Sequence, residues 1–199
     1  MKPFSESCVQ NRVPIIQIIK PLLMKCETVL EIGSGTGQHA VYFATEMPQL
    51  TWYTSDREQN HWGIQQWLDE AKLDNIKPPI ALDVGDQQAW RDLEQSFDAI
   101  FSANTLHIMS ASEVECFFAE VAAILKPQAL LIVYGPFNYQ GRYTSDSNAR
   151  FDDWLKRQNP QSAIRDSEWL DELAKKVAMK RIQDYTMPAN NRILVWQKQ

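Results

Sequence analysis

Hydrophobic residues recur along the chain with two different spacings. In residues 14–23 the apolar side chains fall at positions 15, 16, 18, 19, 22 and 23, which predicts an amphipathic helix beginning near Pro14. The run of residues 28–32 has the length and composition of a buried strand. By the same reasoning we expect further helices over 38–46, 64–71, 87–95 and 112–125, the last capped by Ser112. Further strands are expected over 50–55, 78–84, 97–104 and 129–137.

This alternation predicts an α/β fold, with a mostly parallel sheet and helices on both of its faces. The last part of the chain departs from it. Two helical patterns, over 148–156 and 167–177, are followed by two strand patterns, over 179–187 and 192–198. Only residues 188–191 separate these strands, and a connection this short permits an antiparallel hairpin but no parallel crossover. We therefore expect the sheet to end in an antiparallel pair.

Composition narrows the class of protein. The chain has 199 residues, of which 44% are hydrophobic and 23% charged, as expected for one soluble domain. No apolar run approaches the ~20 residues that span a bilayer, and the first residues lack the apolar core of a secretion signal. The three cysteines, Cys8, Cys26 and Cys116, are far apart in sequence, as in reduced proteins. These features predict a cytoplasmic protein with no membrane partner.

Charge and histidine spacing bear on possible ligands. The net charge is −5, and the one dense basic stretch, residues 175–181, has acidic residues nearby, so a solvated helix end explains it better than a phosphate-binding surface. Nucleic acid is therefore disfavoured as a partner. The three histidines and three cysteines form no HxxxH or CxxC pattern, and we expect no metal site.

Three glycines follow the first predicted strand at every second position: Gly33, Gly35 and Gly37. A P-loop would need a Lys-Ser/Thr pair after its glycines, and none follows here. A dinucleotide-binding fingerprint would need a third glycine where this chain has Gln38. The spacing of the glycines suits a loop whose backbone approaches a ligand of another kind; the alternative is that the glycines serve only a tight turn.

Three carboxylates accompany this loop. Glu31 stands two residues before Gly33, where it would favour a positively charged ligand and repel a pyrophosphate. Asp56 follows the second strand and suits a ribose hydroxyl pair, because a carboxylate accepts two hydrogen bonds; this feature fits a dinucleotide equally well. Asp83, at the end of the third strand, suits an adenine amino group.

Together, the E-x-G-x-G-x-G motif, Asp56, Asp83 and the closing hairpin resemble the class I methyltransferases that use S-adenosylmethionine. That cofactor carries a sulfonium, an ammonium, a ribose and an adenine, and no phosphate. The resemblance extends to a methyltransferase-like family catalogued as a domain of unknown function, with bacterial and animal members. Its segments recur in order over nearly the whole chain: NRVPI, SGTGQHA, LDV, NTLHI, YGPF, TSDSNARFD, IRD and MPANN. One departure is minor, since KPQALL lacks the glycine that methyltransferases usually have before strand five.

The resemblance implies a Rossmann-like class I methyltransferase fold in a single domain over residues 1–199. Residues 1–26 would form an N-terminal segment and helix, 27–135 the cofactor-binding core, and 136–199 a lid, helices and the closing hairpin. The cofactor-binding residues it implies are Arg12, Glu31, Gly33, Ser34, Gly35, Gly37, Asp56, Arg57, Asp83, Val84 and Asn104.

Asn104 and His107 are the catalytic candidates, because the segment after strand four lies beside the transferable methyl group in class I methyltransferases. Asn104 would contact the methionine part of the cofactor or a substrate amine. His107 would accept a proton from the methyl acceptor, since an imidazole titrates near neutrality. The alternative is that His107 is a hydrogen-bonded structural residue between Leu106 and Ile108.

Residues 135–154 form a long polar and aromatic connection that suits a substrate lid. The substrate-contact candidates are Tyr134, Tyr139, Asn148 and Arg150. The alternative is that Ser147 or Asn148 caps the next helix and that the aromatic residues pack its face. The polar residues 5–12 present a similar choice between a frayed end and a segment folded over the cofactor. In the second case Asn11 or, preferably, Arg12 would meet the cofactor carboxylate or the substrate.

We interpret the chain as a methyltransferase whose acceptor is a small molecule first and a protein second. The alternative is a cofactor-binding module that performs no transfer and serves as a partner subunit, because fold does not fix function. An acceptor pocket filled by side chains would favour the module. An open cavity lined by His107 and Asn104 would favour the enzyme.

Overall fold

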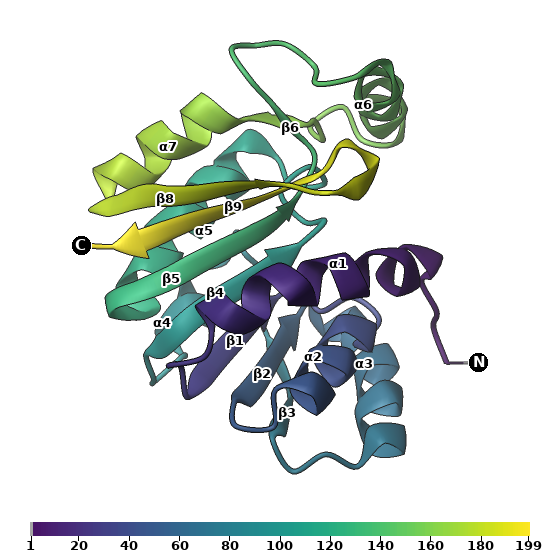
Figure 1. Cartoon of the computed structure of the whole chain (residues 1–199), viewed down its shortest axis with the longest axis vertical. Helices are drawn as coiled ribbons and strands as arrows, with labels where there is room; N and C mark the ends of the chain where they lie inside the picture. The colour runs from purple at the N-terminus through teal and green to yellow at the C-terminus, as the bar shows by residue number, and fades with distance from the viewer. Residues whose placement is uncertain (1) are drawn as a thin grey trace.

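The computed structural model describes residues 2–199, and at its centre is a twisted seven-stranded sheet (Figure 1). The strand order is β3-β2-β1-β4-β5-β9-β8. The strands are β1 (Thr28–Ile32), β2 (Thr51–Asp56), β3 (Ile76–Ala81), β4 (Phe97–Ala103), β5 (Leu125–Gly135), β8 (Met179–Thr186) and β9 (Arg192–Lys198). Strands β1 to β5 pair in parallel, and β9 runs antiparallel to both β5 and β8. The predicted α/β fold and the closing antiparallel hairpin are confirmed.

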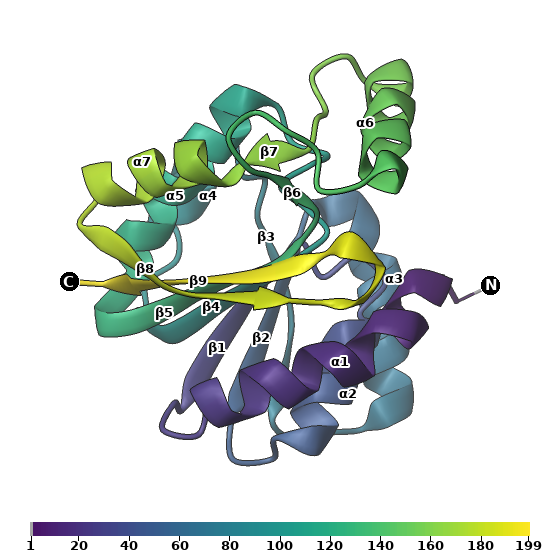
Figure 2. The ribbon, with the colours of Figure 1, turned by 45° about the horizontal axis from the view of Figure 1, so that its top comes forward.

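Helices cover both faces of the sheet (Figures 1 and 2). On one face lie α1 (Glu6–Leu22), α2 (Gln38–Glu46) and α3 (Glu58–Ala71). On the other lie α4 (Gln87–Arg91), α5 (Ala111–Ile124) and α7 (Ser167–Lys176). Helix α6 (Asp146–Gln158) stands away from the sheet, beyond the end of β5 (Figure 2). The helix that follows β1 and the helix that precedes β4 therefore pack on opposite faces, so β1 and β4 flank a topological switch point.

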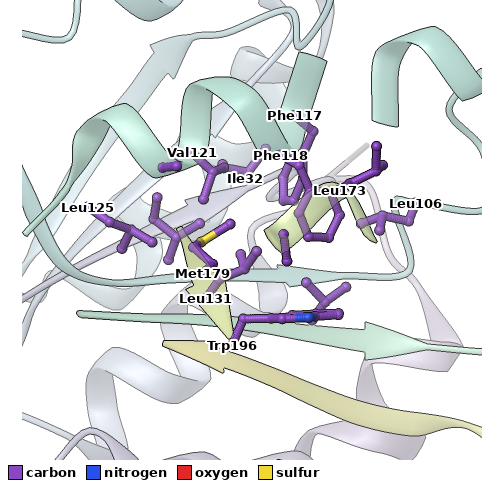
Figure 3. Close-up of a cluster of buried hydrophobic side chains, with 14 of the residues drawn as sticks. Ile32, Leu106, Phe117, Phe118, Val121, Leu125, Leu131, Leu173, Met179 and Trp196 are labelled. Atoms are coloured by element: carbon purple, nitrogen blue, oxygen red, sulfur yellow. The ribbon is translucent and has the colours of Figure 1, made fainter. Parts of the chain in front are cut away.

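Each face has its own apolar core. Figure 3 shows Phe117 and Phe118 of α5 directed toward Leu131 and Trp196 in the sheet. The rings of Phe118 and Trp196 meet edge to face with centroids 5.4 Å apart. On the opposite face Phe43 of α2 packs against aromatic rings of β2 and β4. Parallel strands buried on both faces explain the nearly continuous apolar runs in the sequence.

The N-terminal helix is longer than predicted. It begins at Glu6, not near Pro14, and both Pro14 and Pro21 lie inside it. Proline removes one intrahelical hydrogen bond and usually marks the end or the first turn of a helix, so Pro14 is a misleading signal here. The helix continues through that position because Ile15, Ile16 and Ile19 are buried against the core. Residues 6–13 are therefore helical, and of the two alternatives for the polar N-terminal residues the frayed end is wrong.

Several other predicted boundaries are also wrong. Strand β3 covers Ile76–Ala81 instead of 78–84; as an edge strand it tolerates its two internal prolines. Helix α4 ends at Arg91, and β5 begins at Leu125, directly after α5. The cap of α5 is Ser110, which forms a capping box with Glu113, and not Ser112. The cap of α6 is Ser145, not Ser147 or Asn148.

Two short elements lie outside the predicted pattern. Strands β6 (Phe137–Asn138) and β7 (Arg165–Asp166) pair in parallel and form a separate two-stranded sheet at the two ends of the segment that carries α6. The 3₁₀ turn η1 (Pro188–Asn190) joins β8 to β9. No helix within residues 2–199 combines the length and apolar character needed to cross a membrane.

Candidate functional site

A cavity of about 980 Å³ opens at the carboxyl ends of the parallel strands. The loops after β1, β2, β3, β4 and β5 contribute to its walls, together with α1, α6 and the turn between β8 and β9. This is where open α/β sheets bind their ligands, next to the switch point. Its volume is at the upper end of the range for small-molecule sites, about 300–1,000 Å³, which leaves room for two ligands side by side.

The glycine loop forms the floor of this cavity through Gly33, Ser34 and Gly35. Gly33 has φ +75°, and a Cβ there would lie 2.5 Å from Cγ2 of Thr105. Gly37 lies outside the lining, at the start of α2 with φ +85°, where a Cβ would come within 3.1 Å of the Ile64 backbone. The glycines thus let the loop pass between the strand ends and α3, and they expose its backbone to a ligand.

Asp56 and Arg57 stand side by side at the end of β2, and both line the cavity. The Asp56 carboxylate accepts from the Gly35 N–H at 2.7 Å, from the Arg57 N–H at 2.8 Å and from Asn60 Nδ2 at 2.7 Å. It is therefore held in one orientation at the edge of the glycine loop.

Arg57 in turn is held by two carboxylates. Its Nε lies 3.1 Å from Asp83, and its Nη2 lies 2.9 Å from Glu113. Asp83 does not line the cavity, whereas its neighbours Leu82 and Val84 do. The structure thus places Arg57 and Val84 in the site and turns Asp83 toward Arg57.

Glu31 lies beneath the glycine loop and does not line the cavity. Its side chain is buried and accepts from Trp52 Nε1 at 3.2 Å. Burial raises the pKa of Glu31 to about 7. Its carboxyl group is thus partly protonated near neutrality. The carboxyl group contacts Trp52 in the protein interior and does not reach the cavity.

Asn104 and His107 both line the cavity. Asn104 adopts φ +59°, and its N–H donates to the Tyr134 carbonyl at 2.9 Å; left-handed non-glycine residues of this kind are concentrated at functional sites. The His107 ring meets Phe151 edge to face at 5.3 Å. Burial, with a smaller effect of Arg165, lowers the pKa of His107 to about 4, so the imidazole is neutral at pH 7.

The loop that carries His107 is tied to the segment before β7. Arg165 donates to the carbonyls of Leu106 and Met109, and Ser162 Oγ donates to the Ile108 carbonyl at 3.0 Å. No chemical signal in the sequence marks Arg165 or Ser162, because each acts on backbone atoms of a loop far away in the chain. Residues 164–166, the segment IRD, are noticeable in the sequence only because they belong to the family pattern.

A second histidine, His39 of α2, also lines the cavity, and sequence reasoning missed it. Its Nε2 lies 2.7 Å from Asn11 Oδ1, and burial lowers the pKa of His39 to about 4. The neutral ring therefore donates to Asn11, which leaves the Asn11 amide nitrogen for the Tyr134 hydroxyl. Asn191 contacts the same hydroxyl from the β8–β9 turn. Four elements converge at this point.

The remaining predicted residues divide into two groups. Tyr134 and Asn148 line the cavity, and Asn148 Nδ2 donates to the Asn190 carbonyl at 3.1 Å. Arg12, Tyr139 and Arg150 do not line it. Arg12 lies over the Tyr42 ring at 4.6 Å, Tyr139 donates to Asp184 at 2.8 Å, and Arg150 is exposed on α6.

Residues 2–5, which we call the N-terminal strap, fix the start of α1 beside the cavity. Pro3 packs on Gly63 of α3, and its carbonyl accepts from Trp67 Nε1 at 2.7 Å. The Ser5 backbone exchanges two hydrogen bonds with the side chain of Gln38. Gln38, which replaces the third glycine of a dinucleotide fingerprint, thus joins α1 to the glycine loop.

Comparison with known proteins gives one family match and many similar folds. A family model described as "Protein of unknown function (DUF938)" matches residues 2–198. An O-methyltransferase family protein from Burkholderia thailandensis has a TM-score of 0.84 at 15% identity, over 97% of this chain and 57% of its own. The mitomycin 7-O-methyltransferase MmcR has a TM-score of 0.84 at 16% identity, over 97% and 54% of the two chains.

Human N-acetylserotonin methyltransferase, whose structure contains S-adenosylmethionine, gives a TM-score of 0.82 at 14% identity, over 97% and 53%. At these identities the similarity establishes the fold, which is the Rossmann-like fold of methyltransferases. The chain spans little more than half the length of these structures. Across residues 2–199, no three or more His, Cys, Asp and Glu side chains are grouped so as to hold a metal ion.

Proposed function

The chain belongs to the DUF938 family of proteins of unknown function, and from this fold and cavity we propose that it is an S-adenosylmethionine-dependent methyltransferase acting on a small molecule. One observation carries the proposal. Asp56 and the glycine loop, suited to the cofactor, line the same open cavity as Asn104 and His107, suited to the methyl acceptor. The sulfonium cofactor in the structure of human N-acetylserotonin methyltransferase supports the choice of ligand.

The residues present fit this cofactor. Asp56 would accept from the two ribose hydroxyls, because its carboxylate is oriented by three N–H groups at the mouth of the loop. The apolar side chains of Leu82 and Val84 would cover the adenine. Gly33 and Gly35 leave the backbone bare for the methionine part. Asn104 lines the same space, and its amide has no hydrogen-bond partner within residues 2–199.

The cofactor, when bound, supplies an activated methyl group on a sulfonium. When the methyl group leaves, the electron pair of the C–S bond stays on sulfur. The chain would contribute position and a dry site. His107 is neutral, so its nitrogen is free to take the proton that the acceptor loses. The lowered pKa means that this base is always available at pH 7 but is a weaker base than an ordinary imidazole.

The state of the cavity favours an enzyme over a non-catalytic module. A module would have its acceptor pocket filled by its own side chains, whereas the cavity here is open and is lined by both Asn104 and His107. A small acceptor is preferred to a protein because residues of both α1 and α6 contribute to the walls of the cavity. A protein acceptor would need to enter with an extended side chain.

Transfer of label from S-adenosylmethionine with a labelled methyl group tests the proposal. The purified chain is incubated with a small-molecule extract, and label is counted in products separated from the cofactor. Protein-dependent label, suppressed by S-adenosylhomocysteine, is the expected result. Absence of label with small molecules, together with label on protein acceptors, would contradict the small-molecule assignment. Absence from both would contradict the enzyme.

A further inference from the structure

Charged and uncharged side chains occupy different parts of the cavity lining. Within the described residues, the charged side chains of the lining are Asp56 and Arg57, both at the end of β2. The walls formed by α1, the loop after β4, the end of β5 and α6 carry amides, hydroxyls, the Cys8 thiol, an imidazole and apolar groups. We call this region the uncharged half; its central residues are Asn11, Asn104, His107, Tyr134, Asn148 and Phe151.

The charged side chains behind the uncharged half are directed at the protein. The Arg165 guanidinium donates to the carbonyls of Leu106, Met109 and Gln161. Asp152 of α6 is buried and accepts from the Ile164 N–H at 2.6 Å and the Tyr143 hydroxyl at 2.7 Å; it also pairs with a lysine of its own helix. Neither side chain lines the cavity. An ionised group of the methyl acceptor in the uncharged half would meet no side chain of opposite charge in that part of the lining.

The uncharged half does offer hydrogen bonds. The side chains of Asn104 and His107 have no hydrogen-bond partner among residues 2–199, yet both line the cavity. Asn148 uses its Nδ2 on Thr144 and Asn190, which leaves its Oδ1 as an acceptor. At neutral pH the burial that lowers the pKa of His107 and raises the pKa of Tyr134 keeps both groups uncharged.

We propose that the methyl acceptor is a small molecule that is uncharged at neutral pH and is methylated on a hydroxyl, thiol or amide group. This inference rests on the proposed function and names its substrate class. A carboxylate or phosphate on the acceptor would lose its hydration in the uncharged half and gain no ion pair, which is costly. An ammonium would meet the same cost beside the cationic sulfonium, and its nitrogen has no lone pair to receive the methyl group.

The transfer step balances with the groups present. A lone pair of the acceptor oxygen, sulfur or nitrogen forms the new bond to the methyl carbon, while the C–S bonding pair remains on sulfur. The acceptor then carries one proton too many. That proton passes to the neutral His107 nitrogen and from there to solvent, so the methylated product leaves uncharged.

Fractionation by charge tests the inference while the acceptor is still unidentified. A small-molecule extract is separated by ion exchange into anionic, cationic and neutral fractions at pH 7. Each fraction, and the whole extract, is incubated with the intact chain and methyl-labelled S-adenosylmethionine. We expect the neutral fraction to contain at least about ten times more protein-dependent label than either charged fraction, given the cost of burying an unpaired ion.

A pair of variants places the same new charge in two locations. Asn104→Asp puts a carboxylate into the uncharged half, and Asp tolerates the positive φ of this position. Asn159→Asp puts it at the end of α6, outside the cavity. Labelling in the neutral fraction should fall about tenfold or more in Asn104→Asp, because a buried charge disfavours the acceptor, and should not change in Asn159→Asp.

The outcomes separate the inference from the proposed function. Label confined to a charged fraction would overturn the uncharged acceptor and leave the methyltransferase standing, as would unchanged labelling in Asn104→Asp. Absence of label from the whole extract, although the chain binds S-adenosylhomocysteine, would overturn the transfer reaction and this inference with it.

Discussion

At the scale of single residues, burial disfavours the charged form of three ionisable groups around the cavity. It lowers the pKa of His39 and of His107 to about 4 and raises the pKa of Glu31 to about 7. The histidines bind protons in the unfolded chain that they do not bind in the folded one, so between pH 4 and 6.5 each makes the protein more stable as the pH rises. Glu31 acts in the opposite direction, because its folded form keeps a proton that the unfolded form loses between pH 4.5 and 7.

The first prediction isolates the Glu31 carboxyl with the isosteric variant Glu31→Gln. Well below pH 4.5, Glu31 is neutral in both the folded and the unfolded wild type, and the variant should resemble the wild type in stability. As the pH rises from 4.5 to 7, the variant should gain about 1.4 kcal/mol per pH unit relative to the wild type. Urea unfolding at several pH values measures this difference. A difference that stays constant with pH would show that Glu31 is ionised in the folded protein.

The second prediction concerns His107→Ala. The imidazole has no hydrogen-bond partner within residues 2–199, so its removal leaves no protein group unpaired. Loss of its packing on Phe151 should lower the melting temperature moderately, and cofactor affinity should change little. Turnover should fall by about 10²–10⁴-fold if His107 takes the acceptor's proton. Calorimetry, thermal melting and label transfer provide the three readouts. Normal turnover would remove His107 from catalysis, and joint loss of stability and binding would assign it a structural role.

Sequence reasoning locates residues on the strand ends better than residues on the helices. Asp56, Asn104 and His107 follow directly from strands whose ends must meet at one edge of a parallel sheet. The fork geometry of guanidinium favours Arg12 over Asn11 on chemical grounds, yet Asn11 is the one in the cavity. Once the helix is known to start at Glu6, the spacing of three and four residues places Ser7, Gln10, Asn11 and Pro14 on one face of α1. This is the face that lines the cavity.

At the scale of elements, the N-terminal strap sets the position of α1 on the cavity wall. Gly63→Ala tests this coupling. In a free helix alanine is favoured over glycine by about 1 kcal/mol, but here a Cβ would lie 2.6 Å from Cγ of Pro3 and displace the strap. We expect no gain in melting temperature and a loss of S-adenosylhomocysteine affinity of roughly three- to tenfold.

The matched control is Gln66→Ala, also in α3, whose side chain makes no hydrogen bond to the strap. It should leave cofactor affinity unchanged. If Gly63→Ala raises the melting temperature and binds the cofactor normally, then the strap does not support the site.

The capping box of α5 gives a prediction with a built-in control. Ser110 Oγ accepts from the Glu113 N–H at 3.2 Å, and the Glu113 carboxylate accepts from the Ser110 N–H at 2.6 Å. Ser110→Ala should therefore destabilise the protein by about 0.5–2 kcal/mol. Ser112→Ala, at the cap predicted from sequence, should cost much less. Equal losses in urea unfolding would mean that the box does not stabilise the helix.

Elements are predictable where hydrophobic spacing is regular, and their ends are not. The strands of the sheet and helices α2, α3 and α7 follow from spacing alone. Which serine caps α5, Ser110 or Ser112, depends on which hydroxyl reaches a free N–H group of the first turn. The sequence alone does not distinguish these two candidate caps. Strands β6 and β7 are two residues long and pair across the segment that carries α6, so local spacing carries no signal for them.

At the scale of the whole molecule, two apolar cores hold the sheet from its two faces and so fix the strand ends that carry the site. One core packs α1, α2 and α3 on one face of the sheet, the other packs α5 and α7 on the opposite face, and each core contains residues of β1, β4 and β5. The cavity lies at the carboxyl ends of the strands, next to the switch point. The fold is shared with O-methyltransferases about twice as long, so the substrate class has to be argued from the cavity of this chain.

Binding of S-adenosylhomocysteine, measured by calorimetry on the wild type and on Asp56→Ala with NAD as a parallel titrant, tests the central claim most directly. We predict that the wild type binds S-adenosylhomocysteine and not NAD. Asp56→Ala should weaken this binding by about 1–3 kcal/mol, the range for loss of hydrogen bonds to a charged group. Tight NAD binding, or no binding of S-adenosylhomocysteine to the wild type, would contradict the account; equal affinity in Asp56→Ala would remove Asp56 from the site.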